Sequence, residues 1–372
     1  MLQVLPSLGA GGVERGTIDV ATALVAAGWR AVVVSAGGPA VRELERAGAI
    51  HITLPVDSKN PLVMRANIER LVRVVREHQI DIIHARSRAP AWSARAAAGR
   101  TGVHFITTFH GTYNAANPLK KAYNAIMTRG ERVIAISEFI GEHVREVYGA
   151  DPSRVTVIPR GIDLAVFDRA AVSPERMIRL AQAWRLDDGQ PVIMLPGRLT
   201  EWKGQAVLIE AVARLGRKDL RCILVGDDQG RMAYRQRLEA DIARLGLESV
   251  VHLIGHCNDM PAAYMLADVV VSASTDPEAF GRVAAEAQVL GRLVVATDHG
   301  ASRETVIDKV TGWLVAPNDA QALAEGLRLA LATGPEAREA MTARAVAHVR
   351  ARFTKPRMCA ATLAVYEEVL SR

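Results

Sequence analysis

Short apolar runs alternate with longer amphipathic segments along the chain, a pattern typical of α/β proteins. Runs such as 31–34, 80–84 and 103–109 are bounded by turn residues and rich in β-branched side chains, so they predict buried strands. Between these runs apolar residues recur at helical spacing, as in 61–78, which predicts helices. The regular alternation predicts parallel sheets flanked by helices.

The length of the chain favours two domains. Its 372 residues exceed what one hydrophobic core usually serves, and 49% apolar with 23% charged residues is ordinary for a globular protein. The mixed segment 164–190 predicts the boundary region. No apolar run reaches the ~18 residues of a membrane span, and the N-terminus shows no leader pattern. The three cysteines are too far apart in sequence to form a metal or redox motif, so we expect a cytoplasmic protein.

Charge is unevenly distributed. Residues 1–150 carry 18 Lys and Arg against 12 Asp and Glu, which leaves +6, whereas residues 151–372 carry 28 of each sign. A basic first domain could bind nucleic acid, an anionic membrane surface or a phosphorylated acceptor, and an Arg-rich solvated surface explains the surplus equally well. The helix predicted over 61–78 is the best membrane-surface candidate. The arginines opposite its apolar face are Arg65, Arg70, Arg73 and Arg76.

The stretch 275–286 has the features of a ligand site. It follows the apolar run 267–274, and helical spacing then resumes, so we expect a helix to begin near Phe280. Unpaired N–H groups at a helix N-terminus favour an anion. Glu278 and Glu286 are eight residues apart, a helical rise of about 12 Å, too far for two carboxylates acting on one glycosidic bond. We expect them to hold two distant parts of one long ligand. Taken alone, Glu278 is better interpreted as a solvated loop residue.

Two other segments place polar residues directly after predicted strands, where the ligands of parallel sheets bind. Arg198 and Lys203, five residues apart at such a strand end, could bracket a diphosphate, although a charged loop is as good an interpretation of that segment alone. His110 ends the run 103–109 and precedes a glycine. A lone histidine is more often structural, but this position favours a functional one.

A glycine-rich loop at 9–12 joins the first predicted strand to a helix, which lets the backbone approach a phosphate. Glu14 occupies the third glycine position of the dinucleotide fingerprint, and the next strand lacks the acidic residue that binds ribose. We therefore reject a nicotinamide-dependent oxidoreductase.

Glu278 and Glu286, on either side of Phe280-Gly281, resemble the E-x7-E element of the retaining GT-B glycosyltransferases of family 4. The segment 197–204 is similar to the same family's G-R-x-x-x-x-K-G element. The resemblance runs from about Gly9 to Arg372. It implies an α/β GT-B fold, with two Rossmann-like parallel-sheet domains facing a cleft. The implied domains are an N-terminal acceptor-binding domain of residues 1–168 plus 355–372, whose last helix crosses back to it, and a C-terminal donor-binding domain of residues 169–354.

The resemblance also implies roles for individual residues. The implied catalytic residues are His110, Arg198, Lys203 and Glu278. The implied donor-binding residues are Gly11, Gly12, Arg198, Lys203, Ile254, Phe280, Gly281 and Glu286. Arg198 and Lys203 would hold the donor phosphates, Glu278 the hydroxyls of the sugar and Glu286 those of the ribose. His110 would contact the donor sugar.

The chemistry that follows is sugar transfer from a nucleotide sugar. No D-x-D tripeptide occurs, so we expect no metal and no cofactor, and we expect cationic side chains and helix-end amides to stabilise the leaving group. The resemblance implies retention of configuration, a UDP- or GDP-sugar donor, and a glycolipid or saccharide acceptor, phosphorylated or not, in lipopolysaccharide core or envelope polysaccharide synthesis. We expect no nucleic-acid partner. A sugar-nucleotide epimerase or hydrolase, or a non-catalytic nucleotide-sugar-binding protein, remains an alternative.

Overall fold

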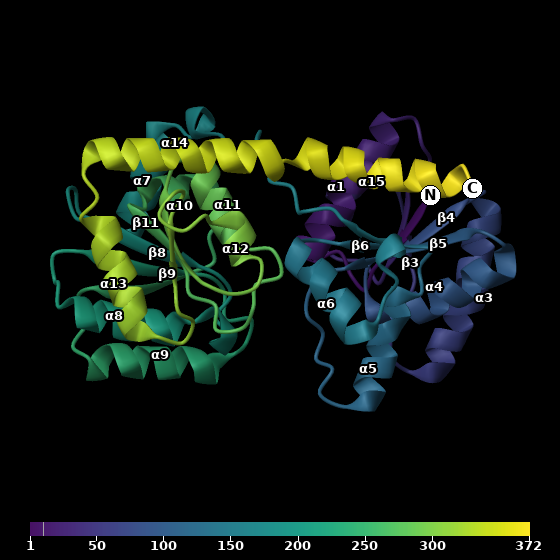
Figure 1. Ribbon diagram of the computed structural model, residues 1–372, viewed down its shortest axis with the longest axis horizontal. Helices are drawn as coiled ribbons and strands as arrows, with labels where there is room; N and C mark the ends of the chain where they lie inside the picture. Colours follow the sequence, from purple (N-terminus) through teal and green to yellow (C-terminus); the bar gives the residue numbers. More distant parts are fainter. Residues whose placement is uncertain (10) are drawn as a thin grey trace. The chain divides into compact units, whose positions relative to one another are not determined.

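The computed structural model describes residues 1–9 and 11–372. They form two compact units, Met1–Gly161 with Lys355–Arg372 (unit 1) and Ile162–Thr354 (unit 2). Each unit is built on one parallel sheet carrying helices, as the ribbon shows (Figure 1). The α/β prediction is thereby confirmed, as is the return of the last helix to the first unit.

Unit 1 contains a seven-stranded sheet in the order β3-β2-β1-β4-β5-β6-β7, and every pairing is parallel. The strands are β1 (Leu2–Val4), β2 (Val32–Ser35), β3 (Ile50–Thr53), β4 (Ile82–Ala85), β5 (His104–Phe109), β6 (Arg132–Ala135) and β7 (Val155–Val157). The central strands β1, β2 and β4 are buried along their whole length. Continuous apolar runs have this outcome in parallel sheets, because helices cover both faces.

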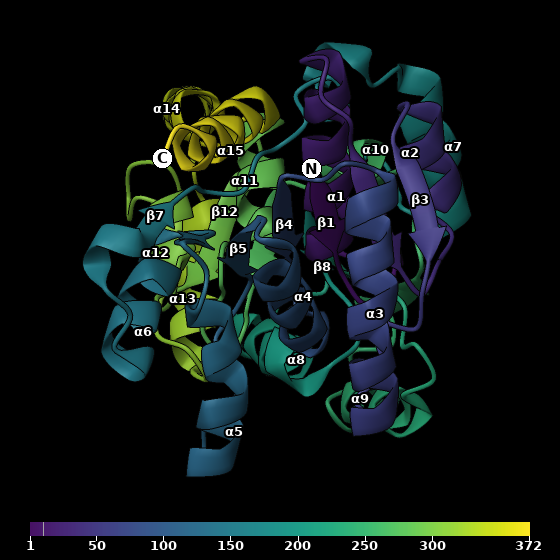
Figure 2. The ribbon, with the colours of Figure 1, turned by 90° about the vertical axis from the view of Figure 1, so that its right-hand side faces the viewer.

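The helices of unit 1 form two packed groups. They are α1 (Gly12–Ala26), α2 (Val41–Arg46), α3 (Pro61–Glu77), α4 (Arg88–Thr101), α5 (Pro118–Asn124), α6 (Glu138–Tyr148) and α15 (Lys355–Leu370). Helix α1 contacts α2 and α15, whereas α3 packs along α4 (Figure 2). Ser137 caps α6 by accepting the N–H of Ile140 at 3.1 Å.

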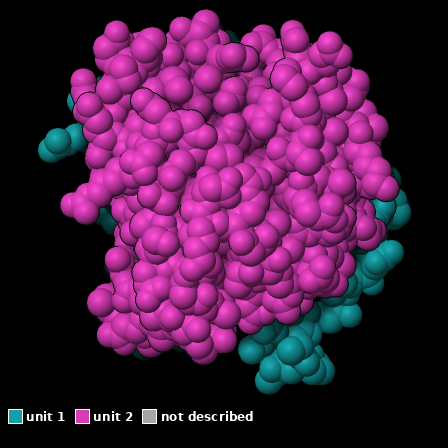
Figure 3. Space-filling model, turned by 90° about the vertical axis from the view of Figure 1, so that its left-hand side faces the viewer, with its two compact units in different colours: residues 1–161, 355–372 teal, residues 162–354 magenta. Residues whose placement is uncertain are grey.

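Unit 2, the magenta surface in Figure 3, contains a six-stranded parallel sheet in the order β10-β9-β8-β11-β12-β13. The strands are β8 (Val192–Pro196), β9 (Arg221–Val225), β10 (Val251–Gly255), β11 (Val269–Ser272), β12 (Leu293–Thr297) and β13 (Trp313–Val315). The helices are α7 (Pro174–Trp184), α8 (Gln205–Leu215), α9 (Met232–Arg244), α10 (Met260–Leu266), α11 (Arg282–Val289), α12 (Ser302–Thr305), α13 (Ala320–Leu331) and α14 (Pro335–Arg352). Cys222 lies in this core with no exposed surface, and burial raises the pKa of its thiol to about 12.

Both sheets contain a point where the strand order reverses. In unit 1 it lies between β1 and β4, and in unit 2 between β8 and β11. The loops that follow such a strand pair leave the sheet in opposite directions and open a crevice at its carboxyl edge, where open α/β sheets bind ligands. Two of the predicted segments, 197–204 and 275–286, follow β8 and β11.

Helix α11 begins later than predicted, at Arg282 and not near Phe280. Gly281 precedes it with φ of +83°, a left-handed conformation that ends the extended chain before the helix starts. Glu278 therefore lies outside the helix, in an extended segment bridged to Gly300. The predicted separation of Glu278 and Glu286 by a continuous helical rise is wrong for this reason. Helix α7, within the segment 164–190, was not predicted at all.

Candidate active site

The loop after β8 is held against the end of β11. Gly204 has φ of +73°, and a Cβ at this position would lie 1.9 Å from the carbonyl oxygen of Ala273. Only glycine permits both the conformation and the approach. The N–H of Thr275 donates to the carbonyl of Trp202 at 2.8 Å. The two loops at the reversal point are thereby joined through their backbones.

This junction brings together Lys203 and Glu278. Lys203 Nζ lies 2.5 Å from Glu278 Oε1, and Ser274 Oγ donates to the same oxygen at 2.6 Å. The two charged side chains are 17% and 11% exposed, so solvent screens the pair less than it screens a surface pair. Glu278 Oε2 has no partner within the described ranges 1–9 and 11–372. The carboxylate is therefore held by one oxygen and can accept ligand hydroxyls with the other.

Two more contacts immobilise this pair. Lys203 Nζ lies 4.1 Å from the ring centroid of Trp202, a cation–π contact. On the other side, the backbone of Glu278 accepts the N–H of Ala301 at 2.8 Å. Gly300 has φ of +59°, and a Cβ there would lie 2.5 Å from the carbonyl oxygen of Glu278. Neither charge is on a freely moving loop.

The N-terminus of α11 follows directly. Phe280 is 4% exposed and packs edge-on against Phe353 with ring centroids 5.4 Å apart, so it can offer a ligand only backbone groups. A Cβ on Gly281 would lie 3.1 Å from Thr305 Oγ1. The first N–H groups of α11 have no partner inside the helix and carry the positive end of its dipole. They can stabilise an anion beside Glu278.

Glu286, inside α11, is held on both oxygens. Arg282 donates to Oε1 from Nε at 3.1 Å and from Nη2 at 2.8 Å, and Tyr264 donates to Oε2 at 3.0 Å. Tyr264 is 1% exposed, and burial, with the adjacent carboxylate adding to it, raises the pKa of its hydroxyl well above the usual range. Tyr264 is therefore a neutral donor. Glu286 retains free lone pairs with which to accept hydroxyls in a fixed direction.

Two predicted residues of unit 2 stand apart from this group. Arg198 is exposed, and its side chain has no hydrogen bond or ion pair within the described chain. Ile254 lies in β10, where the register with β9 shifts between Leu253 and Gly255. Such a bulge leaves the backbone groups of the extra residue unpaired. The structure thus joins Lys203 to Glu278, and leaves Arg198 and Ile254 without contacts to that pair.

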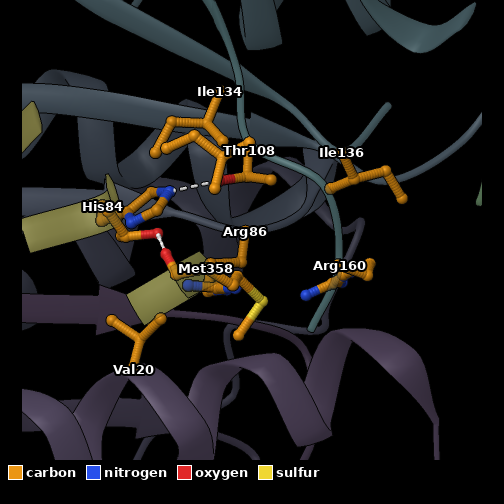
Figure 4. A pocket seen from close by; sticks show the side chains of 10 residues that line it. Val20, His84, Arg86, Thr108, Ile134, Ile136, Arg160 and Met358 are labelled. Carbon is orange, nitrogen blue, oxygen red and sulfur yellow. Dashed lines mark hydrogen bonds between the residues drawn. The ribbon is translucent and has the colours of Figure 1, made fainter. Parts of the chain in front are cut away.

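In unit 1, His110 follows β5 and lies in a cluster of basic side chains. Arg160 Nη2 lies 2.7 Å from His110 Nδ1. Burial, with the charges of Arg160 and Arg86 adding to it, holds the pKa of His110 well below its usual range. His84 lines the same pocket as Arg86 and Arg160, with Nε2 2.6 Å from Thr108 Oγ1 (Figure 4). Its Nδ1 lies 2.7 Å from Tyr366 Oη. Arg86 donates from Nη1 to Gln3 Oε1 at 2.7 Å.

The predicted glycine loop is described except for Ala10, which lies outside the described residues. Helix α1 begins at Gly12, and Gly11 caps it with φ of −173°, which is extended backbone. A Cβ on Gly11 would lie 2.5 Å from Glu14 Oε2, the mobile end of a side chain. Gly11 is therefore not required by backbone conformation.

Several residues of these clusters were missed by sequence reasoning. Ser274, Tyr264 and Arg282 orient the two glutamates, and Arg86 and Arg160 surround His110. Arg282 was detectable, because it lies one helical turn before Glu286 and has the opposite charge. Tyr264, Arg86 and Arg160 are distant in sequence from the residues they contact. Ser274 is only four residues before Glu278, but both lie outside a helix, so no regular spacing indicates their contact.

The sequence matches two protein-family models. Residues 10–166 match Glycosyltransferase Family 4, and residues 178–348 match Glycosyl transferases group 1. A D-inositol 3-phosphate glycosyltransferase of Xylanimonas cellulosilytica is 32% identical over 327 residues, which cover 83% of this chain and 76% of that protein.

Solved structures are similar over nearly the whole chain. A glycosyltransferase from Rickettsia africae is 38% identical, with a TM-score of 0.93 over 99% of this chain and 98% of that one. Anabaena HepE, solved in complex with UDP-glucose, is 26% identical, with a TM-score of 0.87 over 99% of both chains.

Proposed function

The chain belongs to family 4 of the retaining GT-B glycosyltransferases, a metal-independent family, and uses a nucleotide sugar; from that premise we propose that it transfers a hexosyl group from a UDP- or GDP-sugar to a hydroxyl of a glycolipid or saccharide. The observation that carries this proposal is the pairing of Lys203 with Glu278 beside the N-terminus of α11. It offers a cation and helix-end amides for a diphosphate next to a carboxylate for sugar hydroxyls.

Each residue then has a place along the donor. Lys203 and Arg198 bind the diphosphate, helped by the amides of Phe280 and Gly281. Glu278 accepts hydroxyls of the sugar, and Glu286, held by Arg282 and Tyr264, accepts hydroxyls of the ribose. The backbone of Ile254, at the bulge in β10, contacts the base. From unit 1, His110 contacts the donor sugar, and Gly11 and Gly12 contribute to donor binding.

The transfer needs no protein nucleophile. The bond between the anomeric carbon and the diphosphate oxygen breaks, and the acceptor oxygen bonds to the same face of that carbon. The proton of the acceptor hydroxyl passes to the departing phosphate oxygen, so the products are a glycoside and the nucleoside diphosphate. Lys203, Arg198 and the α11 amides stabilise the charge that develops on this oxygen.

We propose that this charge is stabilised without a metal ion. The experiment is turnover after treatment with EDTA and exchange into metal-free buffer. Undiminished kcat supports the proposal, and a loss restored by Mg²⁺ or Mn²⁺ contradicts it. The nucleoside diphosphate product is measured directly, without a coupling enzyme that could itself require a metal ion.

The donor is best identified by binding. UDP-, GDP- and ADP-sugars are compared by their effect on the melting temperature, since a ligand that binds only the folded state raises it. We expect a UDP- or GDP-sugar to give the largest shift, and the Lys203→Ala variant to lose it. If Lys203→Ala shows the full wild-type increase in melting temperature, the donor does not bind through Lys203, and the proposed site is contradicted.

For the acceptor we propose an anionic glycolipid or sugar phosphate of cell-envelope synthesis, such as lipopolysaccharide core. The surplus of +6 in residues 1–150 supports an anionic acceptor, and so does the name of the Xylanimonas cellulosilytica relative, which specifies inositol 3-phosphate. Transfer of labelled sugar to inositol phosphates and to truncated lipopolysaccharide, each beside its dephosphorylated form, tests this. Equal transfer to the dephosphorylated forms contradicts it.

Two other functions predict different products. An epimerase or hydrolase alters the nucleotide sugar without an acceptor, whereas a transferase forms a glycoside only when the acceptor is present. A binding protein gives the thermal shift and no product with any acceptor extract. Product analysis with and without acceptor therefore separates all three.

We further propose that the enzyme works in the cytoplasm, at an anionic membrane surface, through α3. No helix in the described part of the chain is long and apolar enough to span a membrane. Arg65, Arg73 and Arg76 are exposed on α3, whereas Arg70 is half-buried and donates to Asn67 Oδ1 at 2.8 Å. Exposed cations of this kind attract acidic headgroups.

Vesicle co-sedimentation tests this surface. We expect binding to phosphatidylglycerol vesicles and none to phosphatidylcholine, weakened when Arg65, Arg73 and Arg76 are all changed to alanine. Arg350→Ala, an exposed arginine of unit 2, is the control. Equal binding of the triple variant and the wild type would remove α3 from the proposal.

A further inference from the structure

The hydrogen bond between Arg160 and His110 determines which ring nitrogen carries the proton. Arg160 Nη2 is 2.7 Å from His110 Nδ1. A guanidinium has only donors, so Nδ1 must be the acceptor. The imidazole is therefore neutral with its hydrogen on Nε2. A second proton, on Nδ1, would clash with the N–H of Arg160 and be repelled by its charge.

The charged groups that shift the pKa of His110 are all basic. Arg86 and His84 approach it from β4 and the loop that follows, and Arg160 from the loop after β7. Tyr113, in the loop after β5, accepts the backbone N–H of His110 through its hydroxyl at 3.5 Å. Asp19 on α1 faces Arg86. His110 Nε2 is buried and has no partner within the described residues, so this N–H is a donor without an acceptor.

The position of Arg160 depends on Gly16 in α1. Arg160 is 5% exposed, and a Cβ on Gly16 would lie 1.9 Å from Arg160 Nη1 and 3.3 Å from Arg86 Nη2. The guanidinium therefore crosses the helix at a place where any larger residue would displace it. The position of the Arg160 guanidinium therefore depends on glycine at position 16.

We infer that Arg160 is a positioning residue that keeps His110 neutral and fixes its hydrogen on Nε2 as a donor to a ligand oxygen. The inference rests on the proposed function only for the identity of the oxygen. A neutral imidazole with a fixed tautomer is a hydrogen-bond donor whose strength does not change with pH across the physiological range. It also cannot compete as a base for the proton that the acceptor hydroxyl releases, because Nδ1 already accepts the N–H of Arg160.

The tautomer can be measured without any activity assay. In protein labelled with ¹⁵N-histidine, long-range ¹H–¹⁵N correlations distinguish the two tautomers, and loss of the signal in His110→Gln assigns it. We expect the Nε2–H form of His110 from pH 8 down to pH 5.5. In Arg160→Met the ring should titrate and show Nδ1–H as well, whereas Arg160→Lys, which keeps a cationic donor, should restore the wild-type pattern.

Gly16→Ala provides an independent disturbance, because it displaces Arg160 and leaves both side chains chemically intact. We expect it to give the Arg160→Met pattern. An unchanged His110 spectrum in Arg160→Met, or an Nδ1–H form in the wild type, overturns the inference. Either result would stand even if the protein proved to be a nucleotide-sugar-binding protein, so the two proposals fail separately.

Kinetics then connect the tautomer to the reaction. We expect kcat/KM to fall about tenfold in Arg160→Met and in His110→Ala, with no further loss in the double variant, because the two residues act as one unit. The wild-type profile should be flat between pH 5.5 and 8, and that of Arg160→Met should fall on the acid side. Arg154→Met, an exposed arginine near β7, is the control. Fully additive losses would contradict the positioning role.

Discussion

Lys203 Nζ lies 2.5 Å from Glu278 Oε1, although 75 positions separate the two residues in sequence. The contact exists because the loops after β8 and β11 meet where the strand order of unit 2 reverses. It places a cation and a carboxylate at the start of α11. A ligand with a diphosphate and sugar hydroxyls can satisfy both.

The first prediction concerns Lys203. Replacing it by alanine removes a charged hydrogen bond to the diphosphate, worth about 1.5–3 kcal/mol, so kcat/KM for the donor should fall at least ~10-fold. Steady-state kinetics at saturating acceptor measure this. Lys218→Ala, an exposed lysine of the same unit, should leave kcat/KM unchanged. Unaltered kinetics in Lys203→Ala would remove the phosphate-binding role.

Arg198 should matter for a different reason. Its side chain is exposed and makes no contact in the described chain, so it contributes little to folding. We expect Arg198→Ala to lower kcat/KM at least ~10-fold with no change in melting temperature, with Arg350→Ala as the matched control. If Arg198→Ala retains wild-type kcat/KM, Lys203 and the α11 amides bind the diphosphate without it.

Glu286 is predicted to act in nucleotide binding more than in the chemical step. Glu286→Gln keeps the shape of the side chain and one acceptor oxygen, but loses the charge that strengthens hydrogen bonds from the ribose. Calorimetric titration with the nucleoside diphosphate should show about 10-fold weaker binding. Glu339→Gln, exposed on α14, is the control, and wild-type affinity in Glu286→Gln would count against the ribose assignment.

His84 makes stability depend on pH. Burial, with Arg86 and Arg160 adding to it, holds the pKa of His84 well below its usual range. Below about pH 6.5 this histidine is protonated in the unfolded chain but stays neutral in the folded chain. The folded state therefore has the full contribution of His84 to its stability above that pH, and loses it as the pH falls. The slope for one such proton is at most ~1.4 kcal/mol per pH unit.

Melting temperatures at pH 7.5 and 5.5 check this prediction. His84→Gln replaces the ring by an amide that can still reach Tyr366 and Thr108, and it should show a smaller decrease between the two pH values than the wild type. His256→Gln, an exposed histidine of unit 2, should keep the wild-type decrease. An equal decrease in His84→Gln and the wild type would assign the acid sensitivity elsewhere.

The sequence by itself determined most of the elements and the family, although it did not predict α7. Apolar periodicity located the strands and helices, because a strand buried on both faces and a helix buried on one leave different patterns in the chain. The spacing of Glu278 and Glu286 around Phe280-Gly281 identified the family, because that signal is contained in one short segment. Even there the start of α11 was misplaced, because the left-handed Gly281 delays it to Arg282.

Only the tertiary structure decided which side chains contact one another in the candidate site. Lys203 meets Glu278 because the strand order reverses between β8 and β11, and Tyr264 reaches Glu286 from another helix. Arg160 reaches His110 across 50 positions because Gly16 leaves room for its guanidinium. Residue spacing within one segment predicts the helix or strand that the segment forms. The contacts named here depend instead on the order in which strands pair and on the space between packed elements.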